Sequence, residues 1–170
     1  MQPPVFMRLV LLLLAVCTAP SMLPAQADKT EQKVVDLLVE AQSLQGRKRY
    51  VDALAKLQEA ESLAPARPEI YNVRGAIYLA APTRDLDKAR EQFTKARALN
   101  SAEMPPYFNL GEVDFVGGRW PECEQAFSEV LAKFPKLPAS VRHLVLFKVL
   151  VAKVKQNKLD EAEKLLADSF

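Results

Sequence analysis

The chain has 170 residues, of which 49% are hydrophobic and 26% are charged, and its formal net charge is +2. This length suits one domain with its own hydrophobic core. The nearly balanced charge gives no strong positive field, so the sequence predicts no binding of nucleic acid. Glycine is scarce and no alternating β-type runs occur, which favours an all-α fold.

The first 27 residues have the pattern of a secretory signal peptide. Arg8 precedes an unbroken apolar run from Leu9 to Val16. Ala25-Gln26-Ala27 is the small-x-small sequence that signal peptidase accepts, so we expect cleavage after Ala27 and export to the periplasm or out of the cell. A membrane anchor is the alternative, but this apolar run is too short to cross roughly 30 Å of hydrocarbon. The mature chain, 28–170, is therefore expected to have no stable membrane span.

Cys17 gives the N-terminal segment a second interpretation. Leu14-Ala15-Val16-Cys17 resembles a bacterial lipoprotein box, in which cleavage precedes a lipidated cysteine. A small residue usually stands where this chain has Val16, and this departure favours the signal peptide over a lipid-anchored assembly factor. Cleavage after Ala27 leaves Cys123, whose place in an apolar helical stripe indicates a buried small side chain more than a reactive thiol.

Apolar residues recur at helical spacing through the rest of the chain and predict eight helices. In chain order these helices cover 28–45, 51–63, 69–80, 86–99, two helices within 107–135, 141–156 and 159–170.

Glycine and asparagine are expected to end three of these helices. Gly46 follows the first helix, and Gly117-Gly118 separate the two helices within 107–135. Glycine takes positive φ at little steric cost. Asn157 also tolerates left-handed geometry and follows the helix over 141–156.

Other residues are expected to mark helix starts. Asp85 or Thr83 suits the N-cap of the helix over 86–99, and Ser140 suits that of the helix over 141–156. Trp120-Pro121 opens a helix, because proline is tolerated in a first turn. Pro105-Pro106 marks a junction between helices.

Small residues recur at matching places in successive helical pairs. In the first helix of each pair they are Ala41, Gly75 and Gly111, with the larger Leu150 in fourth place. The small residues of the second helices are Ala53, Ala89, Cys123 and Ala162. Successive positions are 34 to 39 residues apart. We expect small residues where two helices approach closely, so that Gly111→Leu would force neighbouring helices apart.

A helical hairpin that recurs near 34 residues resembles the tetratricopeptide repeat (TPR) family. The fourth repeat is the weakest match, and the strongest matches are Leu110-Gly111, the Trp120/Cys123/Phe127/Pro135 pattern and the Tyr50/Ala53/Leu57/Ala60/Pro65 pattern. The resemblance implies a right-handed α-solenoid of about four TPR-like hairpins, of the kind found in exported bacterial proteins. In this chain the repeats would cover about 31–65, 68–101, 104–136 and 140–170.

The sequence contains no pattern that predicts catalysis. His143 is the only histidine, and no cysteine or second histidine stands near it at metal-ligand spacing. No Ser/His/Asp set or glycine-rich phosphate loop can be assembled. We therefore expect no enzyme activity, no metal and no cofactor.

The resemblance implies that another protein binds in a concave groove lined by the first helix of each repeat. Amides there can hydrogen-bond a peptide backbone, and aromatic rings can seat apolar side chains or a helix. The candidate groove residues are Leu38, Gln42, Asn72, Val73, Leu79, Phe108, Asn109, Glu112, Phe115, Phe147 and Lys148.

Two further expectations concern the partner. One family variant clamps a C-terminal carboxylate with lysines, but Leu38, Ala76 and Pro105 occupy key positions here and argue against such a partner. The alternative to an adaptor or assembly scaffold is a structural envelope protein that self-associates through the groove or the terminal repeats. A separate alternative to partner binding is self-burial, in which the N-terminal segment, the last helix or a second copy covers the apolar groove.

Overall fold

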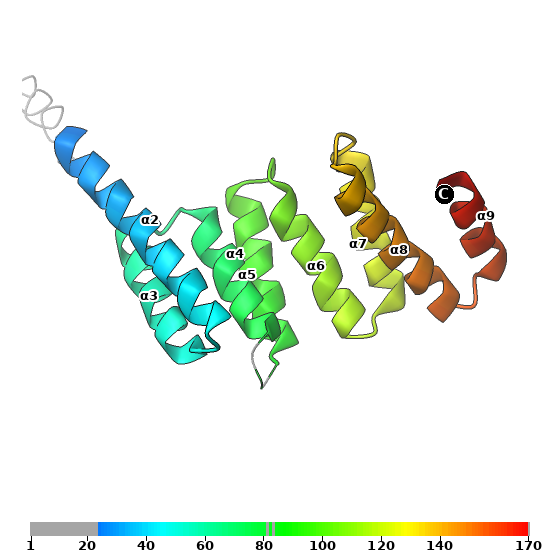
Figure 1. Cartoon of the computed structure of the whole chain (residues 1–170), viewed down its shortest axis with the longest axis horizontal. Helices are drawn as coiled ribbons and strands as arrows, with labels where there is room; N and C mark the ends of the chain where they lie inside the picture. The colour runs from blue at the N-terminus through cyan, green and yellow to red at the C-terminus, as the bar shows by residue number, and fades with distance from the viewer. Residues whose placement is uncertain (1–23, 81, 83, 170) are drawn as a thin grey trace, which may run out of the picture.

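The computed structural model describes residues 24–80, 82 and 84–169, and every regular element in this part of the chain is an α-helix (Figure 1). The helices follow one another along the long axis of the molecule and pair into four hairpins, which confirms the predicted all-α solenoid. Their bounds are α2 Pro24–Gly46, α3 Tyr50–Leu63, α4 Pro68–Ala80, α5 Leu86–Leu99, α6 Met104–Val116, α7 Trp120–Lys133, α8 Ala139–Lys155 and α9 Leu159–Ser169.

The hydrophobic core is divided along the solenoid, and each section joins a hairpin to the first helix of the next one. Leu57 of α3 and Ile70 of α4 belong to one cluster with the apolar residues of α2. Phe127 of α7 and Val145 of α8 belong to another cluster, together with Tyr107 of α6. One hairpin cannot cover its own apolar stripe, so stability comes from the interfaces between neighbouring repeats.

Two glycines of the first helices lie directly against aromatic rings of the second helices. A Cβ at Gly75 would lie 2.6 Å from Cε1 of Phe93, and a Cβ at Gly111 would lie 2.8 Å from Cζ of Phe127. No real side chain tolerates such distances, so these positions require glycine as long as the rings stay in place. The expectation that small residues mark the close approaches is confirmed in the two central hairpins.

The fourth hairpin lacks this close approach. Its two corresponding positions hold Leu150 and Leu166, and Leu166 remains 49% exposed. Ala162 is the buried residue of α9. Figure 1 shows α9 as the last helix of the solenoid, with no following repeat in the described part of the chain. The weak sequence match of the fourth repeat thus corresponds to a loosely packed terminal helix.

Three of the hairpin turns place a residue with positive φ at the same position of the repeat. These residues are Lys48 at 60°, Gly118 at 68° and Asn157 at 61°. In each turn the next backbone N–H donates to a carbonyl five residues earlier, as Arg119 does to Asp114 at 2.9 Å. The prediction for Asn157 is confirmed. The first helix ends at Gly46, as predicted, but the left-handed residue of that turn is Lys48, because the repeat register, more than the residue type, decides which residue is left-handed.

Helix starts were predicted with mixed success. The Asp85 carboxylate accepts a hydrogen bond from the Lys88 N–H at 2.9 Å, which confirms it as an N-cap. Ser140 is not an N-cap, because Pro138 takes that position and α8 begins at Ala139. Pro105-Pro106 lies in the first turn of α6, where the missing N–H groups have no helical partner to lose.

The structure begins its first helix earlier than the sequence predicted. α2 starts at Pro24, whereas a start at residue 28 was expected. Cleavage after Ala27 stays a prediction, and such cleavage would remove the first residues of α2. The signal-peptide run, Cys17 and Thr83 lie outside the described residues. Among the described helices, none is both long and apolar enough to cross a membrane.

Candidate partner-binding surface

The helices α2, α4, α6 and α8 form one long side of the solenoid, which we call the first-helix face. All of the predicted groove residues belong to these four helices. At the N-terminal end, two of the predicted apolar groove residues cannot contact a partner. Leu38 and Val73 are buried in the core between α2 and α4. Gln42 is exposed, and Leu79 is partly buried against the next core section. Val39 of α2 is 60% exposed, so this half of the face presents one exposed apolar side chain beside its polar groups.

An amide pair connects the second and third repeats on this face. Asn109 Nδ2 donates a hydrogen bond to Asn72 Oδ1 at 2.9 Å, and both side chains are half-buried. The amide nitrogen of Asn72 and the carbonyl oxygen of Asn109 take no part in this bond. These two groups offer a donor and an acceptor to the backbone of a bound peptide.

An ion pair connects the third and fourth repeats. Lys148 Nζ lies 3.0 Å from Oε1 of Glu112, and it also lies 3.7 Å from the centre of the Phe115 ring. Both charged side chains are largely buried, so they are weakly screened by solvent. The structure thus brings three predicted groove residues from α6 and α8 into direct contact, and the two charges neutralise each other.

The aromatic residues of the face differ in how far they are available. Phe108 packs its ring edge-to-face against Phe127 with centroids 5.4 Å apart, and Phe115 packs likewise against Trp120 at 5.7 Å. Both rings are half-buried, and these contacts with α7 fix their positions. Phe147 on α8 is 52% exposed. It is therefore the aromatic groove residue that a partner can contact most fully.

A charge cluster on the other side of the first helices was not predicted from the sequence. Asp114 is almost fully buried, forms an ion pair with Arg90 of α5, and accepts from Arg119 Nε at 2.8 Å. The sequence contains a sign of this cluster. The position of Asp114 in the repeat is occupied by Leu44 and Tyr78 in the first two repeats. A carboxylate in place of a large apolar residue predicts a nearby cation, but the sequence does not identify which one.

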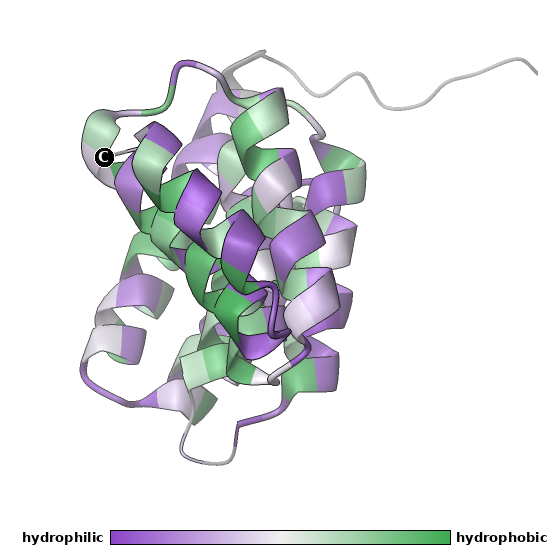
Figure 2. Cartoon of the chain, turned by 90° about the vertical axis from the view of Figure 1, so that its right-hand side faces the viewer, coloured by the Kyte–Doolittle hydropathy of each residue, from purple (hydrophilic) through white to green (hydrophobic). Residues whose placement is uncertain are grey.

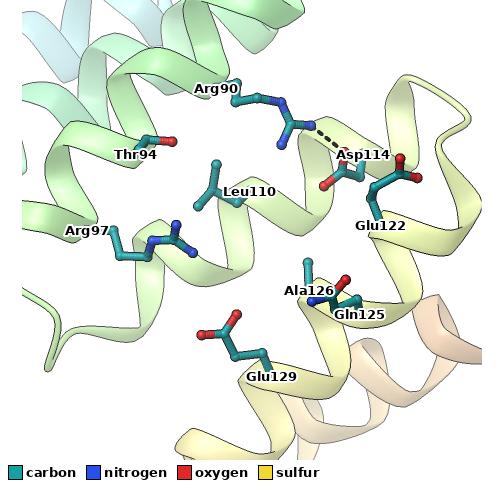
Figure 3. A pocket seen from close by; sticks show the side chains of 9 residues that line it. All are labelled: Arg90, Thr94, Arg97, Leu110, Asp114, Glu122, Gln125, Ala126 and Glu129. Carbon is teal, nitrogen blue, oxygen red and sulfur yellow. Dashed lines mark hydrogen bonds and ion pairs between the residues drawn. The ribbon is translucent and has the colours of Figure 1, made fainter.

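The Asp114 carboxylate lies beside a surface pocket of about 190 Å³ between α5, α6 and α7 (Figure 3). Arg90 and Arg97 project from α5 on one side, and Glu122 and Glu129 project from α7 on the other. Opposite charges face each other across the pocket, and the one buried acid is already paired with two guanidinium groups. The two ion pairs of Asp114 connect the second repeat to the third.

A second charge cluster connects α7 of the third repeat to the last hairpin, α8 and α9. Glu124 of α7 accepts hydrogen bonds from Lys153 of α8, from Lys158 in the α8–α9 turn at 2.8 Å, and from Gln156 at 2.7 Å. Burial alone would raise the pKa of Glu124, but these bonds outweigh it and lower the pKa to about 2. Lys153 also pairs with Glu161 of α9 at 2.6 Å.

Cys123 is fully buried against the α6–α8 core, and burial raises the pKa of its thiol to about 12. A thiol of such pKa is not a nucleophile near neutral pH, which confirms the interpretation as a small core side chain. Within the described part of the chain, no group of three or more histidine, cysteine or acidic residues can hold a metal ion.

Comparison with known proteins supports the fold and not a specific activity. No protein-family model matches the chain. No curated protein matches it by sequence. Among solved structures, the chain is similar to MamA, with a TM-score of 0.68 and 21% identity over 85% of this chain and 79% of that one. It is also similar to SycD, a type III secretion translocator chaperone of Yersinia enterocolitica, with a TM-score of 0.68 and 17% identity over 74% and 95%.

A third similar structure contains a bound peptide. The first TPR domain of Spaghetti (RPAP3), solved with the HSP90 peptide SRMEEVD, has a TM-score of 0.57 and 19% identity over 80% of this chain and 94% of that chain. These likenesses show that the chain has a TPR-like fold. Sequence identities this low show a shared fold and do not show a shared function.

Proposed function

We propose that the chain is an exported interaction protein, an adaptor or assembly scaffold, which binds a peptide or helix of another protein on its first-helix face. The observation that carries this proposal is the composition of that face. It combines an amide pair that retains a donor and an acceptor, Asn72–Asn109, with the exposed ring of Phe147. Such a mixture of backbone-binding and apolar groups suits a protein segment. The proposal assigns no reaction to the chain.

The similar structures support binding in general terms. The RPAP3 domain is described as bound to a peptide, and SycD is described as a chaperone of a translocator. The acidic tail of the RPAP3 peptide is not a suitable ligand here. Leu38, which stands where a carboxylate-binding variant has a lysine, is buried in the core and has no charge.

The test is a pull-down from a bacterial envelope extract with four forms of the chain as bait. The wild type is compared with an amide variant, Asn72→Ala with Asn109→Ala, and with an apolar variant, Phe147→Glu with Val154→Glu. Val51→Glu is the matched control, because Val51 is 81% exposed on α3, away from the face. Circular dichroism checks that all four forms remain helical. We expect a partner held by the wild type and the control to be lost by one or both groove variants.

Equal recovery by all four forms would contradict the proposal. Light scattering of the wild type then decides whether the chain self-associates, which is the structural alternative.

Export is a separate part of the proposal and has its own test. It is supported by the apolar run after Arg8 and by the Ala25-Gln26-Ala27 sequence. Mass spectrometry of the chain recovered from the periplasm or medium is expected to show an N-terminus at Asp28. A lipidated N-terminal Cys17 would show the lipid-anchored form instead, and an intact chain in the cytoplasm would contradict export.

A further inference from the structure

Three exposed large apolar side chains lie on α8, whereas α2 and α6 have one each, Val39 and Val116. Leu144, Phe147 and Val154 are 44%, 52% and 49% exposed, and half-buried Val151 lies between them. Spacings of three, four and three residues place these side chains on one line along the helix axis. We call these four residues the α8 stripe.

The opposite side of α8 is also apolar. Val145, Val149 and Ala152 are buried in the core cluster that α8 shares with α6 and α7. A helix that is hydrophobic on both sides is normally buried on both sides. Figure 2, which looks at the α8–α9 end of the solenoid, shows hydrophobic residues on helices that face the viewer. The stripe side therefore has the composition of an interface that no described part of this chain covers.

The direction of the stripe favours a helical occupant. An extended peptide bound across the first-helix face would cross successive first helices and contact a few side chains of each. The stripe instead runs along one helix from Leu144 to Val154, a length of about 15 Å. Spacing of three and four residues is that of the seam between two packed helices. A partner helix that lies along α8 can therefore contact all four side chains.

Charge indicates the chemistry of that helix. α8 contains four cations, Arg142, Lys148, Lys153 and Lys155, and no acidic residue between 139 and 155. Lys148 and Lys153 form ion pairs within the chain. Lys155 forms no ion pair with the described residues; it is exposed, its Nζ lies 5.9 Å from the centre of the Trp120 ring, and it flanks the stripe on the helical wheel. A second copy of α8 along the stripe would oppose like charges, and an acidic helix would complement them.

The area of the stripe also argues against a second copy as its occupant. Three side chains exposed to about half, together with the less exposed Val151, give roughly 300 Å² of apolar surface. A stable interface between proteins needs about 800 Å² from each partner. The stripe is large enough to seat one side of a single helix, whereas a dimer would require further surface.

We propose that the α8 stripe binds one amphipathic helix of a partner protein, with apolar residues at three- and four-residue spacing and acidic residues beside them. This inference rests on the proposed function, because it names the kind of partner that the same face receives.

The test uses three fluorescent peptides of about three heptads and the chain as purified from expressing cells. All three carry the same seam of leucines. The first has glutamates beside the seam, the second has lysines there, and the third is the first with two central leucines replaced by proline. We expect fluorescence anisotropy to show binding of the glutamate peptide about tenfold tighter than that of the lysine peptide. The proline peptide is expected not to bind, because it cannot form the helix.

Variants of the chain connect this binding to the stripe. Phe147→Glu and Val154→Glu are each expected to weaken binding of the glutamate peptide by about tenfold or more, through lost apolar contact and charge repulsion. Lys155→Glu is expected to reduce the ratio between the affinities for the glutamate peptide and the lysine peptide. Val51→Glu is the matched control and should bind as the wild type does.

Several results would overturn the inference. Equal affinity for the glutamate and lysine peptides would remove the charge argument, and unchanged binding by Phe147→Glu would place the peptide elsewhere. A wild-type dimer that Phe147→Glu dissociates would show that a second copy occupies the stripe. A partner lost only by the amide variant, with no helix peptide bound, would overturn this inference and leave the proposed function standing. A partner retained by every variant would contradict the proposed function itself.

Discussion

Gly111 lies so close to the Phe127 ring that a Cβ at Gly111 would be 2.8 Å from Cζ of that ring. The same relationship holds for Gly75 and Phe93 in the preceding hairpin. In the first hairpin the corresponding pair is Ala41 and Leu57, both of which are fully buried. Where the first helix has alanine in place of glycine, the second helix has leucine in place of phenylalanine. The two changes offset each other in volume and keep the packing density constant.

Gly111→Leu is expected to lower the free energy of unfolding by about 1–3 kcal/mol, because the added side chain overpacks the α6–α7 contact. Urea denaturation followed by circular dichroism measures this change. Combining Gly111→Ala with Phe127→Leu recreates the pair of the first hairpin and should cost less than Gly111→Ala alone. Gly46→Ala is the control, because nothing lies within 4 Å of its Cβ position. A wild-type midpoint for Gly111→Leu would disprove the packing argument.

Removal of the Asp114 carboxylate is expected to weaken the contact between the second and third repeats. Asp114→Ala leaves Arg90 and Arg119 without their shared acceptor, and we expect a loss of about 1–3 kcal/mol in the free energy of unfolding. The two guanidinium groups are partly exposed and can turn to water, which limits the loss. Arg90→Ala should cost less, because Arg119 still pairs with Asp114. Substitution of the exposed Glu91 in the same way serves as the control, and an equal effect there would refute a specific role for Asp114.

The stability of the last hairpin is expected to depend on the ionisation of Glu124. Its pKa in the folded chain is about 2, below the ordinary value of 4.5. A carboxyl whose pKa is lowered by folding contributes stability above its unfolded pKa, and this contribution is lost as the pH falls. For Glu124 the loss should occur between about pH 4.5 and pH 2.

Comparison of the wild type with Glu124→Gln separates the stability contributed by Glu124 from that contributed by other carboxylates, such as Glu61, whose pKa is also lowered. Denaturation midpoints measured across this pH range should converge towards pH 2 as the wild type loses the stabilisation. A difference between the two forms that stays constant with pH would mean that Glu124 does not titrate in this way.

Cys123 is expected to be unreactive until the chain unfolds. Burial excludes reagents and raises the pKa of the thiol to about 12, so almost no thiolate is present at pH 8. The variant Cys17→Ser leaves Cys123 as the only cysteine of the full chain. We expect a thiol reagent at pH 8 to react with this variant in denaturant and not in buffer. Rapid reaction of the folded chain would show that the α6–α8 core opens easily.

The repeated spacing of small and apolar residues was enough to predict four helical hairpins and most helix bounds. Helix formation follows from the sequence within a few turns, so periodicity and residues such as Asp85 and Asn157 carried that information. Turn geometry was predicted less well. Lys48 takes a left-handed conformation that favours glycine, because the packing of the hairpin requires the turn at that position.

The candidate surface was predicted only as a set of positions. The register placed Leu38, Val73 and Phe147 on one face, but it did not reveal that the first two are buried and the third is exposed. That difference depends on how closely neighbouring repeats pack, which the local sequence does not encode.

By itself, the sequence determined the TPR-like register, the helices and the small residues that allow them to pack, since each of these depends on neighbours along the chain. The tertiary structure alone decided the pairs Asn72–Asn109, Glu112–Lys148 and Arg90–Asp114, whose members are 24 to 37 residues apart. It also decided that no described part of the chain covers the outer apolar side of α8. These features arise where one repeat meets the next, because there the distances between side chains are set by the stacking of whole hairpins.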